Sequence, residues 1–354
     1  MQHPAPVSRH LRLPLLGMAI VLLALPVKAS ADLVILAYHH VSSDTPASTS
    51  TSPDLFRGQL DMIAELDMEV VHLTEGTRDA LKGEQNSDQL RVALTFDDAY
   101  ESVYTKAWPL LREKGIPFTL FVTTDALDDG TRGYMSWSQI AELAEHELVT
   151  IGNHSADHGA MIPRADETQE ALKARIADSL DKAQTRIKEE TGIESEIFAH
   201  PYGEFSPALT AALKERDWLG YAQHSGVLGS YSDPHNIPRF PVADAFGGLD
   251  SLKDKLTARN FPVPYDSLPD PLLADNPPVL RMTLPENWDR NRLTCFAPRQ
   301  GVMSIDQVNG QKVSIQADNP LQARRSRYNC TYPAGAGRFY WLSQPWFDKT
   351  QPEG

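Results

Sequence analysis

The first 260 residues alternate between short apolar runs and longer segments with helical periodicity. Short apolar runs are typical of strands that are buried on both faces, and here they lie at residues 33–38, 91–96, 118–122, 148–152, 197–199, 219–222 and 237–242. A strand, a helix and a second strand at this spacing form a βαβ unit, which requires a parallel sheet. The pattern therefore predicts an α/β domain over residues 33–262.

Helix signals fall between these runs. The clearest helix covers residues 168–190, where apolar side chains recur on one side and Gly192 follows as a stop. Ser52 and Pro53 mark the start of an earlier helix, as N-cap and first helical residue. Shorter helices are predicted at residues 108–114, 136–147 and 249–258, and after Ser206.

The chain changes character after the α/β region. Six prolines between residues 261 and 278 predict a semi-rigid linker, which we assign to residues 263–278. Beyond it, short apolar stretches and little helical periodicity predict a small β-sandwich-like domain at residues 279–348. Its aromatic residues have two open roles, packing in a core or stacking on sugar rings, and they include Trp288, Trp341 and Trp346.

Residues 1–31 have the pattern of a secretory signal peptide. Arg9 and Arg12 supply a basic start, residues 13–26 are apolar, and Ala29, Ser30 and Ala31 form a small-residue cleavage site. The apolar run is short for a membrane span, so we expect a membrane anchor only if this segment stays uncleaved. The protein is expected to be exported, either to the periplasm or beyond the cell.

Charge and cysteine content argue against nucleic-acid binding and against a cysteine metal site. The formal net charge is −14, and the basic cluster Arg324, Arg325 and Arg327 is short and predicts a solvated strand face. Nucleic-acid binding therefore has no support. Cys295 and Cys330 are the only cysteines, and an isolated pair in an oxidising compartment predicts a disulfide rather than a metal site.

Polar groups follow three of the predicted strands directly. They are Asp97 and Asp98, His154 and His158, and the turn at residues 200–203. The carboxyl ends of parallel strands meet on one side of a sheet or barrel, so these groups are expected to converge. Because successive strand residues point to opposite faces, Asp97 and Asp98 can share a pocket only if the chain leaves the strand there.

The convergent groups suit metal-assisted hydrolysis. His154 and His158 are four residues apart, which places them on one face of a helical turn. Together with an aspartate they give two imidazoles and one carboxylate, with positions left for water and substrate. Zn²⁺ can lower the pKa of its water from about 15.7 to about 7, and the second carboxylate is then free to act as a base. Helix capping or structural hydrogen bonding remains the alternative for each motif alone.

The ordered motifs Thr-Phe-Asp-Asp, His-Ser-x-x-His and Pro-Tyr-Gly resemble the polysaccharide deacetylases of carbohydrate esterase family four, which share the NodB homology domain. The resemblance covers about residues 33–262. It implies a distorted (β/α) barrel, here followed by the small β-rich domain. It also implies removal of N- or O-acetyl groups from sugar polymers. The pattern is most similar to the branch that contains exported poly-N-acetylglucosamine deacetylases.

The resemblance also implies roles for individual residues. Asp97 would be the general base, and Zn²⁺ or another divalent transition metal would be held by Asp98, His154 and His158. The backbone N–H of Tyr202 would serve the oxyanion hole, and Pro201 would shape the acetyl pocket.

Two family features are missing from the sequence. The arginine that pairs with the base is replaced by Ala199, and Arg239 is expected to take its place from another strand and to help bind the substrate. The usual Leu-x-His motif, whose histidine protonates the leaving amine, is not recognisable. His224 is our candidate for that acid, with His200 as a second possibility. For His39 and His40, which follow the first strand, a site role and a structural role both stay open.

The leading hypothesis is an exported, metal-dependent enzyme that removes N-acetyl groups from an N-acetylhexosamine polysaccharide. One alternative is a glycan-binding protein that keeps the metal site but has no efficient acid. Another is an O-acetyl esterase that uses the same site, since esters need less help at the leaving group.

Overall fold

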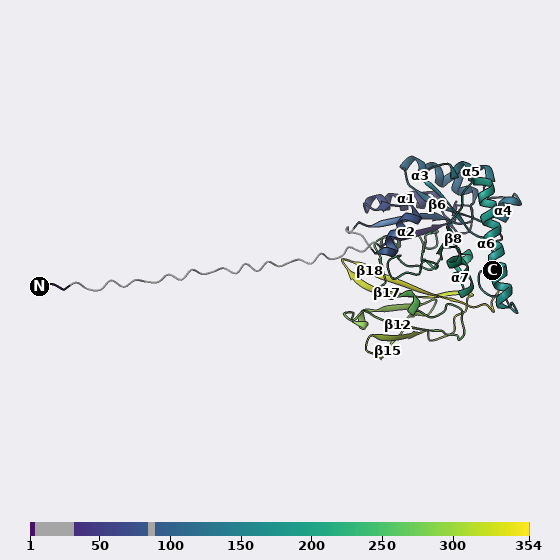
Figure 1. The fold of residues 1–354 in the computed structure, drawn as a ribbon. Coiled ribbons are helices and arrows are strands. Elements are labelled where there is room, and N and C mark those ends of the chain that lie inside the picture. Colours follow the sequence, from purple (N-terminus) through teal and green to yellow (C-terminus); the bar gives the residue numbers. More distant parts are fainter. Residues whose placement is uncertain (4–31, 84–88, 354) are drawn as a thin grey trace.

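The computed structural model describes residues 1–3, 32–83 and 89–353. Almost all of the predicted signal peptide lies outside these residues. A parallel sheet wrapped by helices forms one region, and the C-terminal strands pack against it as a second, β-rich region (Figure 1). Within the described residues, no helix combines the length and the apolar character needed to cross a membrane.

The parallel sheet forms a distorted barrel, as predicted. Its strand order is β10-β1-β5-β6-β7-β8-β9, and β4 also pairs with β5. Ile237 bridges Tyr221 at one edge, and Phe240 pairs with Leu36 at the other, so one short segment joins both edges. The strands are β1 (Val34–Tyr38), β4 (Glu69–Val70), β5 (Arg91–Phe96), β6 (Phe118–Val122), β7 (Val149–Asn153), β8 (Ile197–Ala199), β9 (Leu219–Tyr221) and β10 (Phe240–Pro241).

The apolar runs form strands because both of their faces are buried. Every residue of β1, β5 and β6 is buried. Alternate side chains such as Ile35 and Phe121 join a cluster inside the barrel, whereas Leu36 and Leu120 pack outward against the helices. This double burial explains why these strands show no polar alternation.

The helices agree with the predicted segments, with small shifts at their ends. Gly115 and Gly192 end two helices in the left-handed conformation, and Ser136 and Gln139 make the predicted capping box. The helix that follows Ser136 stops at Ala144, three residues before its predicted end. The helices are α1 (Pro53–Glu65), α2 (Leu73–Lys82), α3 (Trp108–Lys114), α4 (Thr124–Asp128), α5 (Trp137–Ala144), α6 (Gln169–Thr191), α7 (Pro207–Glu215) and α8 (Leu249–Leu256).

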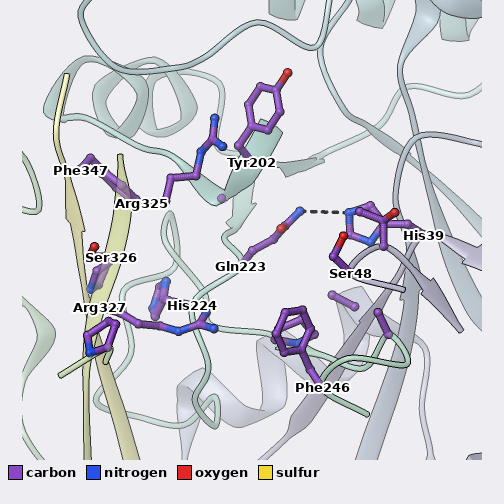
Figure 2. A pocket seen from close by; sticks show the side chains of 17 residues that line it. His39, Ser48, Tyr202, Gln223, His224, Phe246, Arg325, Ser326, Arg327 and Phe347 are labelled. Atoms are coloured by element: carbon purple, nitrogen blue, oxygen red, sulfur yellow. Dashed lines mark hydrogen bonds between the residues drawn. The ribbon is translucent and has the colours of Figure 1, made fainter. Parts of the chain in front are cut away.

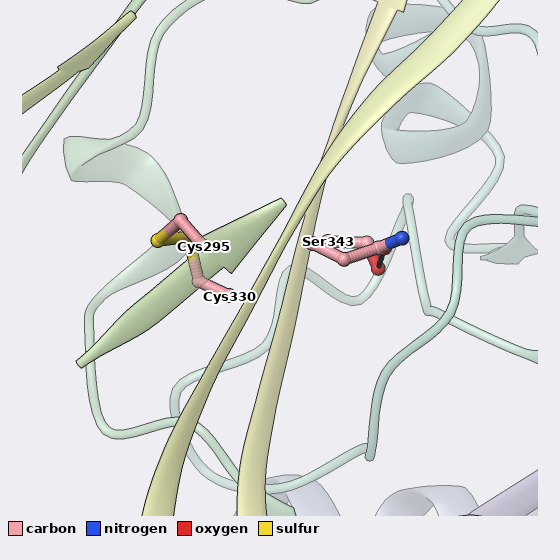
Figure 3. The surroundings of a disulfide bond; sticks show 4 residues. Cys295, Cys330 and Ser343 are labelled. Atoms are coloured by element: carbon pink, nitrogen blue, oxygen red, sulfur yellow. Dashed lines mark hydrogen bonds between the residues drawn. A yellow bond between two sulfur atoms is a disulfide. The ribbon is translucent and has the colours of Figure 1, made fainter. Parts of the chain in front are cut away.

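Two sheets make up the β-rich region and share one apolar core. The larger has the order β11-β18-β17-β13-β14, and the smaller has the order β12-β16-β15. Cys295 and Cys330 face each other on β13 and β17 and form the predicted disulfide (Figure 3). The strands are β11 (Arg259–Asn260), β12 (Val279–Thr283), β13 (Thr294–Ala297), β14 (Gly301–Val302), β15 (Ile305–Asn309), β16 (Lys312–Gln316), β17 (Arg325–Gly335) and β18 (Arg338–Phe347).

The two regions are joined by more than the chain between them. β11 directly follows the last barrel helix, yet it pairs with β18 of the larger C-terminal sheet. Within the proline-rich segment, Leu272 bridges Phe347, and the Tyr265 hydroxyl lies 2.7 Å from His224 Nε2 of the barrel region. The predicted linker therefore contacts both regions at these points, although the domain boundaries themselves stay a prediction.

The tryptophans of the β-rich region pack on other aromatic rings. Trp346 is buried and lies edge-on to Tyr328. Trp341 contacts Phe240 of the barrel, and Trp288 stacks on Tyr332 at a centroid distance of 3.7 Å. Core and junction packing thus accounts for these contacts.

Candidate active site

The site lies where the carboxyl ends of the barrel strands meet, and its loops have unusual backbone conformations. Positive φ angles occur in three separate loops, at Asp98, Ala99, Ser155, His158 and Tyr202. Such angles cost a non-glycine residue on the order of 1 kcal/mol and tend to gather at functional sites. At Asp98, a φ of 74° turns the chain out of β5, so Asp97 and Asp98 can serve one pocket.

The structure brings Asp98, His154 and His158 together. Their ligand atoms all lie within 4.8 Å of one another, and Asp98 Oδ1 is 3.3 Å from His154 Nε2 and 3.2 Å from His158 Nε2. The predicted helical turn is wrong, because residues 154–159 form an irregular loop. The positive φ angles of Ser155 and His158 shape that loop and aim both rings at Asp98.

The environment of His154 fits a bound cation. Its Nδ1 lies 2.8 Å from the carbonyl oxygen of Ala199, and because a carbonyl only accepts, Nδ1 must carry the proton. In the neutral ring, Nε2 then presents a lone pair toward Asp98. Within the described part of the chain, this buried Nε2 has no hydrogen-bond partner. Two acceptors that face each other in this way are satisfied by a divalent transition metal.

Electrostatics at the cluster support the same conclusion. Burial alone would raise the pKa of Asp98, but the contacts with His154 and His158 bring this pKa well below its usual value. Burial would lower the pKa of His154, and the neighbouring Asp98 and Asp97 raise it instead. A cation bound here would replace the proton that these groups otherwise share. The affinity of the site for the cation must therefore depend on pH.

Asp97 is held by a buried arginine. Arg239 donates from Nη1 to Asp97 Oδ1 at 2.7 Å and from Nη2 to Asp97 Oδ2 at 2.8 Å, and both side chains are fully buried. The desolvation of Asp97 would raise its pKa, but the charge of Arg239 outweighs this and lowers it. Arg239 thus occupies the expected pairing position, but without exposed surface it is not placed to contact a substrate.

Two further residues lie near Asp97: His39, for which the sequence left a site role open, and Gln223, which was not singled out. Gln223 donates from Nε2 to Asp97 Oδ2 at 3.1 Å, and the same nitrogen lies 3.4 Å from His39 Nε2 (Figure 2). His39 Nε2 is 3.9 Å from Asp97 Oδ2, and its side chain is 16% exposed. His39 directly follows β1, so its strand-end position was the available signal, whereas Gln223 carried none.

His224 and His200 are both buried. Burial, followed by the charge of Arg327, lowers the pKa of His224 to about 3. His200 is fully buried, and burial holds its pKa well below the ordinary value. Both histidines are therefore uncharged at neutral pH, which does not favour the acid role predicted for them.

The loop that carries Pro201 and Tyr202 packs tightly on its neighbours. Gly203 has a φ of 70°, and a Cβ there would lie 2.7 Å from Gln223 Cβ, so only glycine fits. The Tyr202 ring lies edge-on to His158, with centroids 4.5 Å apart. The Arg325 guanidinium sits 4.2 Å from the Tyr202 ring centroid. These contacts place Tyr202 between the histidine loop and the C-terminal sheet.

A pocket of about 390 Å³ adjoins the cluster and has walls from both regions of the chain. His39, Tyr202 and Gln223 form the barrel wall, and Arg325 and Arg327 belong to the C-terminal wall (Figure 2). The prediction of a solvated basic face at residues 324–327 is wrong. Two of its arginines line this pocket, and Arg324 is 8% exposed.

Comparisons with known proteins agree with this fold. Residues 84–221 match the family described as polysaccharide deacetylase. The putative polysaccharide deacetylase YxkH of Bacillus subtilis is 23% identical over 62% of this chain and 74% of its own length. The poly-beta-1,6-N-acetyl-D-glucosamine N-deacetylase of Escherichia coli is 25% identical over 60% of this chain, but the match spans only 36% of that protein. The solved structure of IcaB from Ammonifex degensii is 26% identical, with a TM-score of 0.55, over 64% of this chain and 97% of its own.

Proposed function

We propose that the chain hydrolyses N-acetyl groups of an N-acetylhexosamine polysaccharide, a reaction at carbon–nitrogen bonds other than peptide bonds, and the match of residues 84–221 to the polysaccharide deacetylase family supports this. The observation that carries the proposal is the cluster of Asp98, His154 and His158 beside the ion-paired Asp97. Relatives named for poly-beta-1,6-N-acetyl-D-glucosamine support this class of substrate.

Asp98, His154 and His158 would hold the metal, for which we propose Zn²⁺. When bound, such a cation polarises a carbonyl group and makes water more acidic. Asp97 takes the proton of the attacking water, whose oxygen adds to the acetyl carbon. Arg239 keeps Asp97 ionised and fixes the direction of its carboxylate. The backbone N–H of Tyr202 donates to the oxygen that gains charge, and Pro201 shapes the space for the acetyl group.

The carbon–nitrogen bond then breaks, and the leaving nitrogen takes a proton to become a free amine while acetate departs. His39 is better placed to supply this proton than His224. Both histidines line the pocket, but His39 is 16% exposed with its Nε2 3.9 Å from Asp97 Oδ2, whereas His224 is buried and its Nε2 lies 2.7 Å from the Tyr265 hydroxyl. We therefore assign the acid role to His39.

The predicted signal peptide supports export, to the periplasm or beyond the cell, where an acetylated polysaccharide would be available. The Cys295–Cys330 disulfide is consistent with an oxidising compartment. A membrane association is proposed only for a chain that retains residues 1–31.

The test is acetate release by zinc-loaded protein from β-1,6-linked N-acetylglucosamine oligomers and from a model acetyl ester, beside the Asp98→Ala variant. Release from the amide that disappears in Asp98→Ala would support both the activity and the metal site. Release from the ester alone would favour an O-acetyl esterase. No release from either substrate, with zinc bound, would favour a glycan-binding protein.

A further inference from the structure

The C-terminal wall of the pocket is cationic although the protein as a whole is acidic. The chain carries a formal net charge of −14. Among the described residues that line the pocket there is no aspartate or glutamate, whereas Arg325 and Arg327 of β17 are both present. The barrel wall opposite them contributes His39 and Gln223. The charge of this wall therefore differs in sign from that of the chain.

Arg325 has its counter-charge within the protein. Its Nε donates to Glu204 Oε1 at 2.9 Å, and its Nη2 donates to the backbone carbonyl of Glu353. Glu204 is fully buried and also accepts from Arg324 Nε at 2.6 Å. Arg324, Arg325 and Glu204 thus form a satisfied group, and little of the charge on Arg325 is left for a ligand.

Arg327 is different. It is half-buried, and within the described part of the chain its side chain makes no hydrogen bond, ion pair or ring contact. Figure 2 shows its side chain extending from β17 into the pocket between His224 and Phe246. A partly desolvated guanidinium without acceptors is costly, so this position favours a ligand that supplies them.

Next to Arg327, Lys255 adds positive charge, whereas the neutral His224 adds none. Burial, and then the charge of Arg327, lowers the pKa of Lys255 to about 8. The pKa of His224 is lowered by the same two causes. Lys255 donates to the carbonyl oxygen of Phe246, so it is held at this corner. The corner between β17 and α8 therefore attracts an anion.

The cationic surface continues beyond this pocket. A second hollow of about 320 Å³ shares Pro298, Arg325 and Ser326 with the first. It adds Arg299 and Gln300, and no acidic residue of the described chain lines it. A sugar polymer that enters the first pocket can thus extend over the C-terminal sheet without meeting a carboxylate.

We propose that Arg327 is an anion subsite, which binds a carboxylate or phosphate group carried by a sugar unit next to the one that is deacetylated. The substrate class is then an acetylated polysaccharide with anionic substituents rather than a uniformly neutral one. The inference rests on the proposed function for the identity of the polymer. The guanidinium would form charge-assisted hydrogen bonds with two oxygens of the anionic group.

The experiment compares three oligomers of β-1,6-linked N-acetylglucosamine of equal length. One is neutral, one carries a single uronic-acid carboxylate, and one carries a single phosphate ester. Dissociation constants are measured by calorimetry with the zinc-loaded full-length protein, and acetate release is followed in the same samples. Arg327→Gln removes the charge, Arg327→Lys keeps it, and Arg281→Gln removes a charge from an exposed position on β12.

We expect an anionic oligomer to bind about tenfold more tightly than the neutral one, because desolvation of the anion and of the guanidinium offsets part of the gain from the two hydrogen bonds. Arg327→Gln should remove this preference, Arg327→Lys should retain part of it, and Arg281→Gln should leave it unchanged. Comparison of the carboxylate oligomer with the phosphate oligomer identifies which of the two anionic groups the subsite prefers. High salt should weaken the preference.

Equal dissociation constants for neutral and anionic oligomers in the wild-type protein would overturn the proposal. A preference that survives in a folded Arg327→Gln variant, with the melting temperature of the wild type, would also overturn it. Failure of the proposed function has a different signature. In that case no oligomer releases acetate, while the dissociation constants still report on the subsite.

Discussion

The two walls of the pocket hold their charged groups in different ways. Behind the barrel wall, Asp97 is matched by the bidentate Arg239, and both are fully buried. At the C-terminal wall, Arg324 and Arg325 are matched by Glu204, a buried residue of the barrel, but the Arg327 side chain is left without an acceptor in the described chain. The barrel wall is therefore organised before any substrate arrives, whereas the C-terminal wall keeps one cation open.

The difference separates chemistry from recognition. A base must be ionised and aimed before the reaction begins, which a buried ion pair ensures. A group that selects a substrate must instead gain its partner only when the substrate binds. Variants of the barrel wall should consequently change the catalytic rate, and variants of the C-terminal wall should change the choice of substrate. The expected effects decrease from the metal cluster to the contact between the walls.

The largest effects are expected at the metal cluster and the base. His154→Ala should lose zinc and all measurable activity, because it removes a buried ligand. Asp97→Asn should retain zinc but lower kcat by about 10²–10⁴-fold, the usual contribution of a general base. Zinc content measured by atomic absorption, together with rates of acetate release, distinguishes the two. A zinc-loaded Asp97→Asn variant with a wild-type kcat would remove Asp97 from the mechanism.

Arg239→Met should be the next most damaging change. It leaves a buried carboxylate without its partner, which typically costs about 3–5 kcal/mol of unfolding free energy. Urea unfolding measures this cost, and Arg281→Met, at an exposed position, is the matched control with an expected change near zero. A loss no larger than that of the control would show that the pair contributes little to stability.

The same variant tests the ionisation of the base. Arg239 lowers the pKa of Asp97, so the ion pair stabilises the fold above the ordinary aspartate pKa and this stabilisation is lost as pH falls through the lowered pKa. Without Arg239, burial should raise the pKa of Asp97. The acid limb of the kcat/KM profile should then move to higher pH, and an unchanged limb would mean that Asp97 does not control it.

The barrel wall could be predicted because its groups directly follow apolar runs. Asp97, Asp98 and His154 come immediately after buried strands, and parallel strand ends must meet. Arg239 was expected to pair with Asp97 even though the two are 142 residues apart. The conformation of the histidine loop was not predictable, because nothing in the local pattern indicates positive φ at Ser155 and His158.

The C-terminal wall could not be predicted in the same way. Arg324 and Glu204 are 120 residues apart, and no local sequence pattern predicts that they form an ion pair. A run of arginines at a strand start is usually solvated, so the sequence favoured the wrong environment for it. The disulfide was predictable because it required only a cysteine count and an exported chain.

Loss of the disulfide should affect stability more than chemistry. Replacing both Cys295 and Cys330 by alanine removes a cross-link between residues 35 apart in sequence, which should lower the free energy of unfolding by about 3–4 kcal/mol. Calorimetry measures that loss. Zinc affinity should stay within a factor of two, because the ligands belong to the barrel, and a large loss of zinc would mean that the barrel depends on the C-terminal sheet to form its metal site.

The smallest effect is expected where the two walls meet, at Glu204. This residue follows the Pro201–Gly203 turn and accepts from Arg324 and Arg325 of the C-terminal region. The C-terminal sheet therefore holds the loop that carries Tyr202. Glu204→Gln keeps the shape but removes the charge, which should cost about 2 kcal/mol of unfolding free energy.

If Tyr202 is displaced slightly, kcat should fall by about tenfold while zinc stays bound, because misplacement affects the transition state more than substrate binding. Glu196→Gln is the matched control, since Glu196 pairs with Arg78 in an exposed ion pair that is worth less than about 1 kcal/mol. Equal kcat values for Glu204→Gln and Glu196→Gln would show that the C-terminal sheet does not position the loop. A fall in kcat for Glu204→Gln alone would show that this sheet positions the loop that carries Tyr202.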